Sequence, residues 1–307
     1  MIHIYTRTNK IFHKEYLKYF LANITGRNRG PRAVVESLVR GLKELNIEFK
    51  INPSYSSIKR DDVVYVVTGI QVLKDIIQLK KKEVFSKLLA GPSITVLPTE
   101  ENGLIQDSAI NAVIVPSEWV KKLYESIDNS LSSRIFVLPA GVQVPEKLEK
   151  ISKDKILIYR KNVPQEILNK VQEILRSKNI GYSILDYGSF KRDDFFTALD
   201  ECAAMIYLSP TESQGLALHE AWIRDVPTLV WNRGFWQYKD IVWKDAQISA
   251  PYLSHETGMF FKDETDFEQQ FEVFVKQIEN FEPRKHSLEN FTDKKCIEKL
   301  MWIIDSI

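Results

Sequence analysis

The chain has 307 residues, enough for two domains of ordinary size. Hydrophobic residues make up 44% of it and charged residues 27%, a composition that excludes a disordered chain and indicates a globular one. Lys and Arg total 42 against 41 Asp and Glu, so the net charge gives no argument for nucleic-acid binding.

The number of cysteines and the hydropathy of the chain indicate the cellular compartment of the protein. Cys202 and Cys296 form no motif, and so low a count suits a reducing compartment. No apolar run approaches the length that crosses a bilayer, and the start of the chain lacks the apolar core of a signal peptide. We therefore expect a cytoplasmic protein, and leave open whether it also touches a membrane surface.

The first half of the chain alternates short apolar runs with segments of helical periodicity. The apolar runs predict buried strands at residues 2–5, 47–51, 63–67, 94–97, 112–115 and 135–138. Helices are predicted for residues 31–45, for a region around 73–88, and from Ser117, which is suited to be a helix N-cap. Strands that alternate with helices are typical of an α/β domain with a parallel sheet.

A segment rich in glycine and arginine, residues 26–32, precedes the first predicted helix. Gly30 is followed by Pro31, a residue favoured at the first position of a helix. A glycine-rich loop that opens a helix can bind an anion, but this one lacks the Gly-Lys-Ser/Thr ending of a P-loop. An ordinary loop is the alternative.

Two charged features of the first half each have two interpretations. The run Lys80-Lys81-Lys82 is either a patch for nucleic acid or anionic lipid or, as we favour, a solvated helix face. Glu100 and Glu101 follow the predicted strand 94–97, and α/β sheets bind ligands at the carboxyl ends of strands. This pair either faces a cleft between domains or forms a solvated acidic turn.

The second half repeats the alternation after a segment rich in Pro, Lys and Glu, residues 143–154. Strands are predicted at residues 156–159, 182–185, 203–208 and 228–231, and helices at 165–177, 193–201, 216–224, 265–278 and 292–304. Residues 232–236 are predicted to form an aromatic loop. We therefore expect a second doubly wound α/β domain.

Two loops of this second domain carry candidate binding residues. Arg160 and Lys161 follow a predicted strand directly, and a forked guanidinium beside a point charge suits a diphosphate, with plain surface charge as the alternative. Tyr187, Gly188 and Phe190 lie in the loop after the next strand, where they would border the base of a bound nucleotide. Either aromatic ring could stack on that base, although we favour core packing as the role of both.

The most informative stretch runs from residue 205 to 231 as strand, loop, helix and strand, which is half of a doubly wound sheet. Its loop, Glu212-Ser213-Gln214-Gly215, leads into a helix that begins near Leu216. A phosphate could bind the backbone amides of Gly215 and Leu216, because the first amides of a helix lack intrahelical partners and glycine leaves room.

Seven residues separate Glu212 from a second carboxylate, Glu220, inside the helix. A carboxylate suits vicinal hydroxyls, such as those of ribose or hexose, because it offers two acceptors in one plane. The alternatives are an i,i+4 surface pair of Glu220 with Arg224, and a Glu212 that only favours the helix N-terminus. The helix is strongly apolar, however, so Glu220 should be partly buried and require a specific partner.

The sequence S-P-T-E-S-Q-G-L-A-L-H-E-A-W-x-x-x-V-P resembles the glutamate-seven-glutamate signature of retaining glycosyltransferases with the GT-B fold, of the large family-four type. It departs from that signature at Ser213 and Asp225, where the family has glycine. Two further motifs, V-P-S-E-W and L-P-A-G-V, resemble the end of the first domain in the same family.

The resemblance implies two Rossmann-like domains with a cleft between them. Residues 1–145 would be the acceptor-side domain and residues 146–290 the nucleotide-sugar-binding domain, while residues 291–307 would form a helix that crosses back to the first domain. The activity it implies is hexosyltransferase-like: transfer of a sugar from a UDP- or GDP-sugar, with retention of anomeric configuration, to a glycan, lipid or small-molecule acceptor. No cofactor and no metal is expected, and the chain has no Asp-x-Asp motif or His cluster.

The resemblance also assigns roles to residues. Arg160, Lys161 and the amides of Gly215 and Leu216 would bind the diphosphate, and Glu220 would hold the ribose. The donor sugar would be held by Glu212, with Ser213 and Gln214 beside it, and Gly30 belongs to a loop that approaches the donor phosphates. Glu100 is a candidate general base from its position alone, and His219 is taken as a packing residue.

Three other functions are weighed against transfer. They are a GT-B nucleotide-sugar epimerase, a non-catalytic nucleotide-sugar binder and, last, a nucleic-acid-binding protein that uses the basic run and the arginines of residues 27–32.

Overall fold

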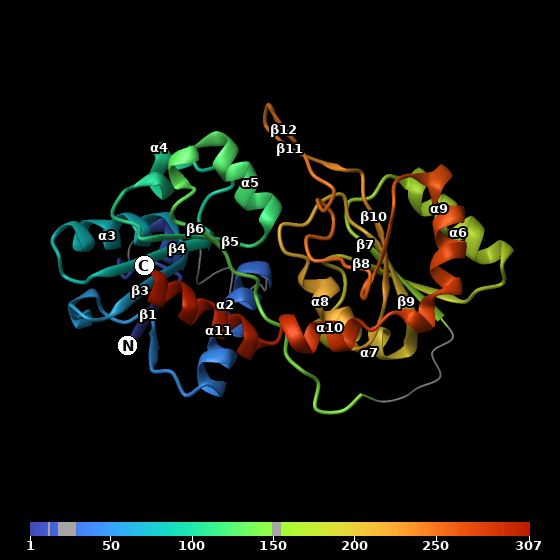
Figure 1. The fold of residues 1–307 in the computed structure, drawn as a ribbon, viewed down its shortest axis with the longest axis horizontal. Coiled ribbons are helices and arrows are strands. Elements are labelled where there is room, and N and C mark those ends of the chain that lie inside the picture. Colours follow the sequence, from blue (N-terminus) through green and yellow to red (C-terminus); the bar gives the residue numbers. More distant parts are fainter. Residues whose placement is uncertain (12, 18–28, 149–154) are drawn as a thin grey trace. The chain divides into compact units, whose positions relative to one another are not determined.

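The computed structural model describes residues 1–11, 13–17, 29–148 and 155–307. The chain forms two compact units (Figure 1): unit 1 comprises Met1–Gly141 and Asp293–Ile307, and unit 2 comprises Val142–Thr292. Residues 26–28 of the glycine- and arginine-rich segment lie outside the described residues. Among the residues that are described, no helix is both long and apolar enough to span a membrane.

Unit 1 contains a six-stranded sheet in the order β2-β1-β3-β4-β5-β6, with all neighbours parallel. The strands are β1 (Ile2–Tyr5), β2 (Phe49–Ile51), β3 (Val63–Thr68), β4 (Lys87–Ser93), β5 (Ala112–Val115) and β6 (Ile135–Val137). The helices are α2 (Arg29–Glu44), α3 (Ile70–Lys81), α4 (Glu100–Gly103), α5 (Glu118–Ile127) and α11 (Asp293–Ser306), with short 3₁₀ turns at Tyr55–Ser57, Leu104–Gln106 and Asn129–Leu131. The central strands are almost wholly apolar because helices cover both faces of a parallel sheet.

The C-terminal helix α11 belongs to unit 1, where it packs along α2. Its buried side chains include Cys296, Ile297 and Leu300. An ion pair also joins the two helices, with Arg40 Nε 2.6 Å from Asp293 Oδ2. Residues Asp293–Ile307 thus form one compact unit with Met1–Gly141.

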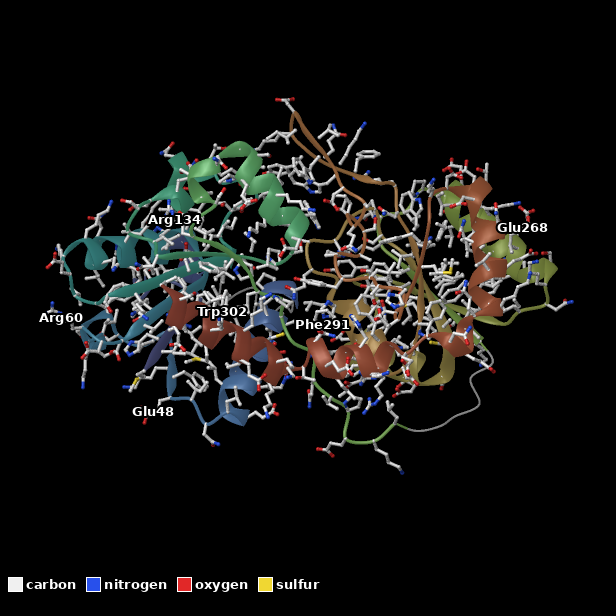
Figure 2. All side chains as sticks on the ribbon, viewed as in Figure 1. Glu48, Arg60, Arg134, Glu268, Phe291 and Trp302 are labelled. Carbon is white, nitrogen blue, oxygen red and sulfur yellow. The ribbon has the colours of Figure 1, made fainter. Side chains whose placement is uncertain are left out.

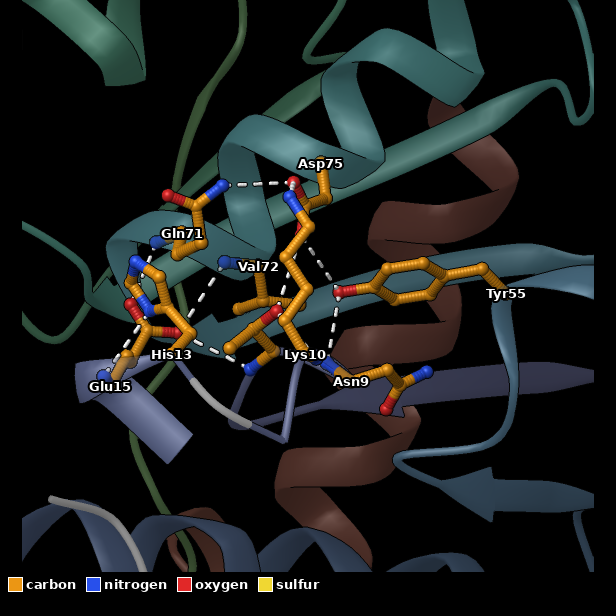
Figure 3. A network of polar contacts seen from close by, with 9 residues as sticks. Asn9, Lys10, His13, Glu15, Tyr55, Gln71, Val72 and Asp75 are labelled. Carbon is orange, nitrogen blue, oxygen red and sulfur yellow. Dashed lines mark hydrogen bonds and ion pairs between the residues drawn. The ribbon is translucent and has the colours of Figure 1, made fainter. Parts of the chain in front are cut away.

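The strand order of unit 1 reverses beside β1, and the segment that follows β1 lies near α3 (Figure 3). Asp75 of α3 accepts hydrogen bonds from Lys10 Nζ at 2.7 Å and from the Tyr55 hydroxyl at 3.4 Å. The Glu15 carboxylate accepts a 2.7 Å hydrogen bond from the backbone N–H of Gln71, in the first turn of α3. A negative charge is favourable there, since it caps unpaired amides and opposes the helix dipole.

Unit 2 contains a five-stranded parallel sheet in the order β13-β10-β9-β7-β8. The strands are β7 (Lys155–Arg160), β8 (Tyr182–Asp186), β9 (Cys202–Leu208), β10 (Thr228–Trp231) and β13 (Gly258–Phe261). The helices are α6 (Gln165–Ser177), α7 (Arg192–Glu201), α8 (Leu216–Trp222), α9 (Glu264–Lys276) and α10 (Pro283–Asn290), with a 3₁₀ turn at Ile278–Asn280. An antiparallel hairpin joins β11 (Phe235–Tyr238) to β12 (Ile241–Lys244).

Two apolar layers enclose the sheet of unit 2. Side chains of α6 and α9 pack on one face, and side chains of α7 and α8 pack on the other. Charged side chains such as Glu268 of α9 lie on the outside (Figure 2). The strand order reverses beside β7, which has β8 on one side and β9 on the other. Doubly wound sheets bind ligands at such a switch point, outside the carboxyl ends of the strands.

Three predictions about elements were wrong. The strand expected at residues 94–97 is instead β4, Lys87–Ser93, and the preceding helix ends at Lys81. Gly91-Pro92 normally indicates a turn, but here Gly91 has φ +120° inside the strand and passes against the backbone of β5. The end of the expected aromatic loop, Phe235 and Trp236, belongs instead to β11, and α10 was not predicted because its polar sequence has no apolar stripe.

Candidate functional site

The carboxyl ends of β7 and β9 bring Lys161 and Glu212 together, although 51 positions separate them in the chain. Lys161 follows β7 directly, and its backbone N–H donates a 2.8 Å hydrogen bond to the carbonyl of Leu208, the last residue of β9. The loop after β9 then returns, anchored by a 2.8 Å hydrogen bond from the Glu212 N–H to the carbonyl of Ile248. Both residues were predicted to contact the same ligand, and the structure places them in contact.

Three donors converge on one oxygen of the Glu212 side chain. Lys161 Nζ lies 2.8 Å from Glu212 Oε1, the Tyr207 hydroxyl 2.7 Å and the Ser209 hydroxyl 2.8 Å. The Glu212 side chain is only 12% exposed. Charge-assisted hydrogen bonds are the stronger class, so these three fix the orientation of the carboxylate closely.

Arg160 and Lys161 are adjacent in sequence but face different sides of the sheet. Ile156 and Ile158 pack with α6 and α9, and Tyr159 packs with α7 and α8. Side chains alternate along a strand, so Arg160 belongs to the α6/α9 face and Lys161 to the face of Tyr207 and α8. Arg160 pairs with Asp186 at the end of β8. The geometry therefore groups Lys161, rather than Arg160, with Glu212.

Glu220 is partly buried on α8 and has a partner on another helix. Its carboxylate oxygen Oε1 lies 2.6 Å from Arg192 Nη2 and 3.1 Å from Arg192 Nε, and the Glu220 side chain is 15% exposed. Arg224 is the residue four positions after Glu220 that was the alternative partner. Its Nε lies 3.3 Å from Asp200 Oδ1, and its guanidinium lies over the Phe196 ring. One ion pair of Glu220 thus reaches from α8 to α7 and supplies a partner of the kind that a partly buried carboxylate needs.

The loop before α8 has the backbone shape that its glycine predicts. Gly215 has φ +80° as the residue that precedes the helix, a conformation that costs other residues energy. Ser213 is exposed, Gln214 is buried and Leu216 is half-buried. The helix ends at Trp222, earlier than expected, and Asp225 takes φ +63°, which Asp tolerates better than most residues.

The loop after β8 separates its two aromatic residues. Tyr187 is 51% exposed, and the Lys161 ammonium lies 4.9 Å from the centre of its ring. Gly188 beside it is exposed, with φ +89°. Phe190 instead packs edge-on against Tyr159, with ring centres 6.0 Å apart. Tyr187 therefore presents a ring at this edge of the sheet, whereas Phe190 has the packing role that was its alternative.

Two predicted site residues, Gly30 and Glu100, belong to unit 1. Gly30 is exposed in the first turn of α2. Glu100 Oε2 accepts hydrogen bonds from the backbone N–H groups of Val96 and Leu97, at 2.9 and 3.3 Å. This is the pattern of a residue that stabilises its own turn, and the role of general base stays a prediction.

The basic run of α3 is engaged within unit 1. Lys80 Nζ donates to the carbonyl of Ser86, and Lys81 Nζ lies 2.7 Å from Asp107 Oδ2. These contacts suit the solvated helix face that we favoured for residues 80–82. Within the part of the chain that is described, no three His, Cys, Asp or Glu side chains are grouped as metal ligands would be.

His219 is a packing residue, as the sequence suggested. Its ring is buried among Trp222, Tyr252 and Phe291, with ring centres 4.6 to 5.3 Å away. Burial, with a smaller contribution from His286, lowers the pKa of His219 to about 3. The imidazole is therefore neutral at physiological pH.

Sequence reasoning missed the residues that hold the acidic side chains. Tyr207 and Ser209 gave a usable signal: a tyrosine inside an apolar strand needs a partner for its hydroxyl, and Ser209 begins the loop at that strand's end. Arg192 gave none, because 28 positions separate it from Glu220 and only the packing of α7 beside α8 brings them together.

Comparison with known proteins bears on the fold. No protein-family model and no curated protein sequence matches the chain. The chain is similar in structure to the apo form of the lipopolysaccharide outer core galactosyltransferase WaaB, with a TM-score of 0.60 and 11% identity over 99% of each chain. It is also similar to sucrose-phosphate synthase from Thermosynechococcus elongatus, with a TM-score of 0.53 and 11% identity over 80% of this chain and 73% of that one.

The chain has the GT-B fold.

A third GT-B structure extends the comparison. It is the pneumococcal O-GlcNAc transferase GtfA in complex with UDP and GlcNAc, with a TM-score of 0.51 and 13% identity. The match covers 86% of this chain and 58% of that one, so the chain spans little more than half the length of GtfA. The GT-B fold with two Rossmann-like units, which the sequence resemblance implied, is thereby confirmed.

Proposed function

We propose that the protein is a glycosyltransferase that moves a hexose from a UDP- or GDP-sugar to a glycan, lipid or small-molecule acceptor, with retention and without a metal ion. The observation that carries the proposal is the contact of Lys161 with Glu212 at the switch point of unit 2. In a parallel sheet this is the place for a nucleotide. The solved GT-B structures support the proposal, since GtfA is described in complex with UDP and GlcNAc and WaaB as a galactosyltransferase.

Transfer breaks the bond between the anomeric carbon and the diphosphate oxygen, so negative charge develops on the leaving group. Lys161 stabilises that charge as a cation placed before the reaction begins. Its ammonium has three donors, so it can bind a phosphate oxygen while one donor remains on Glu212. The amides of Gly215 and Leu216 add further donors, and Arg160 supports the same charge from the other face.

The two glutamates divide the hydroxyl groups between them. Glu212, fixed by its three donors, holds hydroxyls of the donor sugar close to the reacting carbon. Glu220 holds the ribose, and this requires its contact with Arg192 to rearrange or to be shared. Tyr187 stacks on the base, because its ring is the exposed aromatic group at this edge of the sheet.

The test is turnover of a panel of activated sugars. The protein is incubated with UDP-, GDP- and ADP-sugars and a panel of acceptors, with and without EDTA, and release of nucleoside diphosphate is measured. We expect nucleoside diphosphate to be released from sugars of one nucleotide only, at a rate that EDTA does not lower. NMR of the product should show the anomeric configuration of the donor. Binding without turnover on any acceptor, epimerisation of the donor alone, or loss of activity in EDTA would each contradict the proposal.

A further inference from the structure

Tyr207 is a core tyrosine whose hydroxyl contacts the candidate site. Its side chain is buried on β9, where its backbone is paired with β7 on one side and β10 on the other. Its ring stacks on Tyr159, with ring centres 4.9 Å apart and planes 14° from parallel. The ring is therefore fixed by both sheet and stack, and its hydroxyl lies 2.7 Å from Glu212 Oε1.

The chemistry of this hydroxyl makes it a permanent donor. Burial, together with the neighbouring Glu212 carboxylate, raises the pKa of the Tyr207 phenol well above its ordinary value. The phenol thus keeps its proton and donates it toward the carboxylate. A hydrogen bond from a rigid, buried donor to a charged acceptor restricts the acceptor more than one from a mobile surface group.

Ser209, the first residue after β9, also restrains the Glu212 carboxylate. Its buried hydroxyl lies 2.8 Å from the same oxygen, Glu212 Oε1, and its own position follows directly from the end of β9. A lysine alone could hold the carboxylate in many orientations, because an ammonium group is a point charge on a flexible stem. Two short, buried hydroxyl donors leave the carboxylate far less freedom.

We propose that Tyr207 is a positioning residue, which fixes the Glu212 carboxylate for recognition of the donor sugar. This inference rests on the proposed function, because it is Glu212 that would bind the sugar. The alternative is a purely structural role, in which Glu212 only accepts the hydrogen bond of the buried Tyr207 hydroxyl. The two roles differ in what they predict for binding. If Tyr207 positions Glu212, its loss lowers the affinity that the sugar contributes and leaves the affinity for the free nucleoside diphosphate unchanged.

The experiment measures the affinity that the sugar adds. Wild-type protein is titrated calorimetrically with UDP-glucose, UDP-galactose, GDP-mannose and ADP-glucose, and with UDP, GDP and ADP, to find a pair that binds. Tyr207→Phe is then titrated with that pair. Tyr65→Phe is the control, because it also removes a buried tyrosine hydroxyl, in β3 of unit 1, and that hydroxyl has no hydrogen-bond partner within the described part of the chain.

We expect Tyr207→Phe to bind the free nucleoside diphosphate as wild type does and to bind the nucleotide sugar about tenfold more weakly, the usual effect of one hydrogen bond to a charged group. Tyr65→Phe should change neither affinity. If Tyr207→Phe aggregates, Ser209→Ala removes a donor to the same oxygen and should show the same selective loss.

Two results would overturn the inference while wild type still binds. One is a Tyr207→Phe protein with both affinities intact, and the other is an equal loss of both. A wild-type protein that binds none of the seven compounds would instead contradict the proposed function, and this inference with it.

Discussion

Replacing His219 with leucine should remove part of the acid sensitivity of the protein. The wild-type imidazole is buried among Trp222, Tyr252 and Phe291, and neither of its ring nitrogens has a hydrogen-bond partner among the residues that the structure describes. Its pKa falls from 6.5 to about 3, chiefly because burial disfavours the charged form and also because His286 is near. The folded protein therefore excludes a proton that the unfolded chain accepts.

The sign and size follow from linkage. Above pH 6.5 the group is neutral in both states and costs nothing. Below pH 6.5 the unfolded chain gains a proton that the folded protein cannot bind until the pH approaches 3, so stability is lost as the pH falls through this range. At pH 5 the loss is about 2 kcal/mol, from 1.5 pH units at about 1.4 kcal/mol each.

The assay is urea unfolding at pH 7 and pH 5, followed by tryptophan fluorescence. The drop in unfolding free energy between these pH values should be about 2 kcal/mol smaller for His219→Leu than for wild type. His255→Gln is the control for removal of a histidine as such, because the His255 side chain is 91% exposed. Equal drops for wild type and His219→Leu would refute the reasoning, whatever the absolute stability of the variant.

Three further predictions concern the site and the fold. Lys161→Met should weaken binding of the nucleoside diphosphate about 10- to 100-fold, because it removes a charge-assisted hydrogen bond, and calorimetry measures this. Glu220→Ala should weaken nucleotide binding by a similar factor, through the loss of its contacts to the ribose. Gly91→Ala should destabilise unit 1 by about 3 kcal/mol or more in thermal or urea unfolding, since it forces a side chain into φ +120° and against the carbonyl oxygen of Ile114.

Each of these variants has a control in the chain. Lys170→Met removes a half-buried lysine of α6 and should leave affinity unchanged, and an equal loss in both lysine variants would mean a non-specific charge effect. Arg192→Gln tests whether Glu220 is only a counter-ion; in that case it and Glu220→Ala would lower stability alike and neither would alter affinity. Gly181→Ala meets ordinary contacts and should cost little, so a cost as large as that of Gly91→Ala would contradict the packing argument.

The site was predictable where its residues follow the ends of apolar strands. Lys161 follows such a strand directly, and Glu212 lies in the loop after another. Parallel strands end at one edge of a sheet, so the meeting of these two residues needed no knowledge of helix packing. The partners Arg192 and Asp186 depend on which helix or strand lies next to which. The sequence contains no local signal for which elements are neighbours, because the strand order β10-β9-β7-β8 decides this.

The fold was predictable where local and tertiary preferences agree. The predicted helix at 165–177 and strand at 228–231 match α6 and β10. The wrong predictions fall where local and tertiary preferences disagree. Gly91-Pro92 is a sequence typical of turns but lies inside the strand β4, and the polar helix α10 has no apolar stripe from which it could be predicted. The hairpin at 235–244 was missed because its strands are short and its aromatic residues follow directly on a loop.

A crystal structure of the complex with the nucleotide sugar that binds tests the central claim most directly. The account predicts a diphosphate within hydrogen-bond distance of Lys161 Nζ and of the backbone N–H of Gly215 or Leu216, with hydroxyls of the sugar on Glu212. A nucleotide bound elsewhere, or a diphosphate with no contact to Lys161, would contradict it.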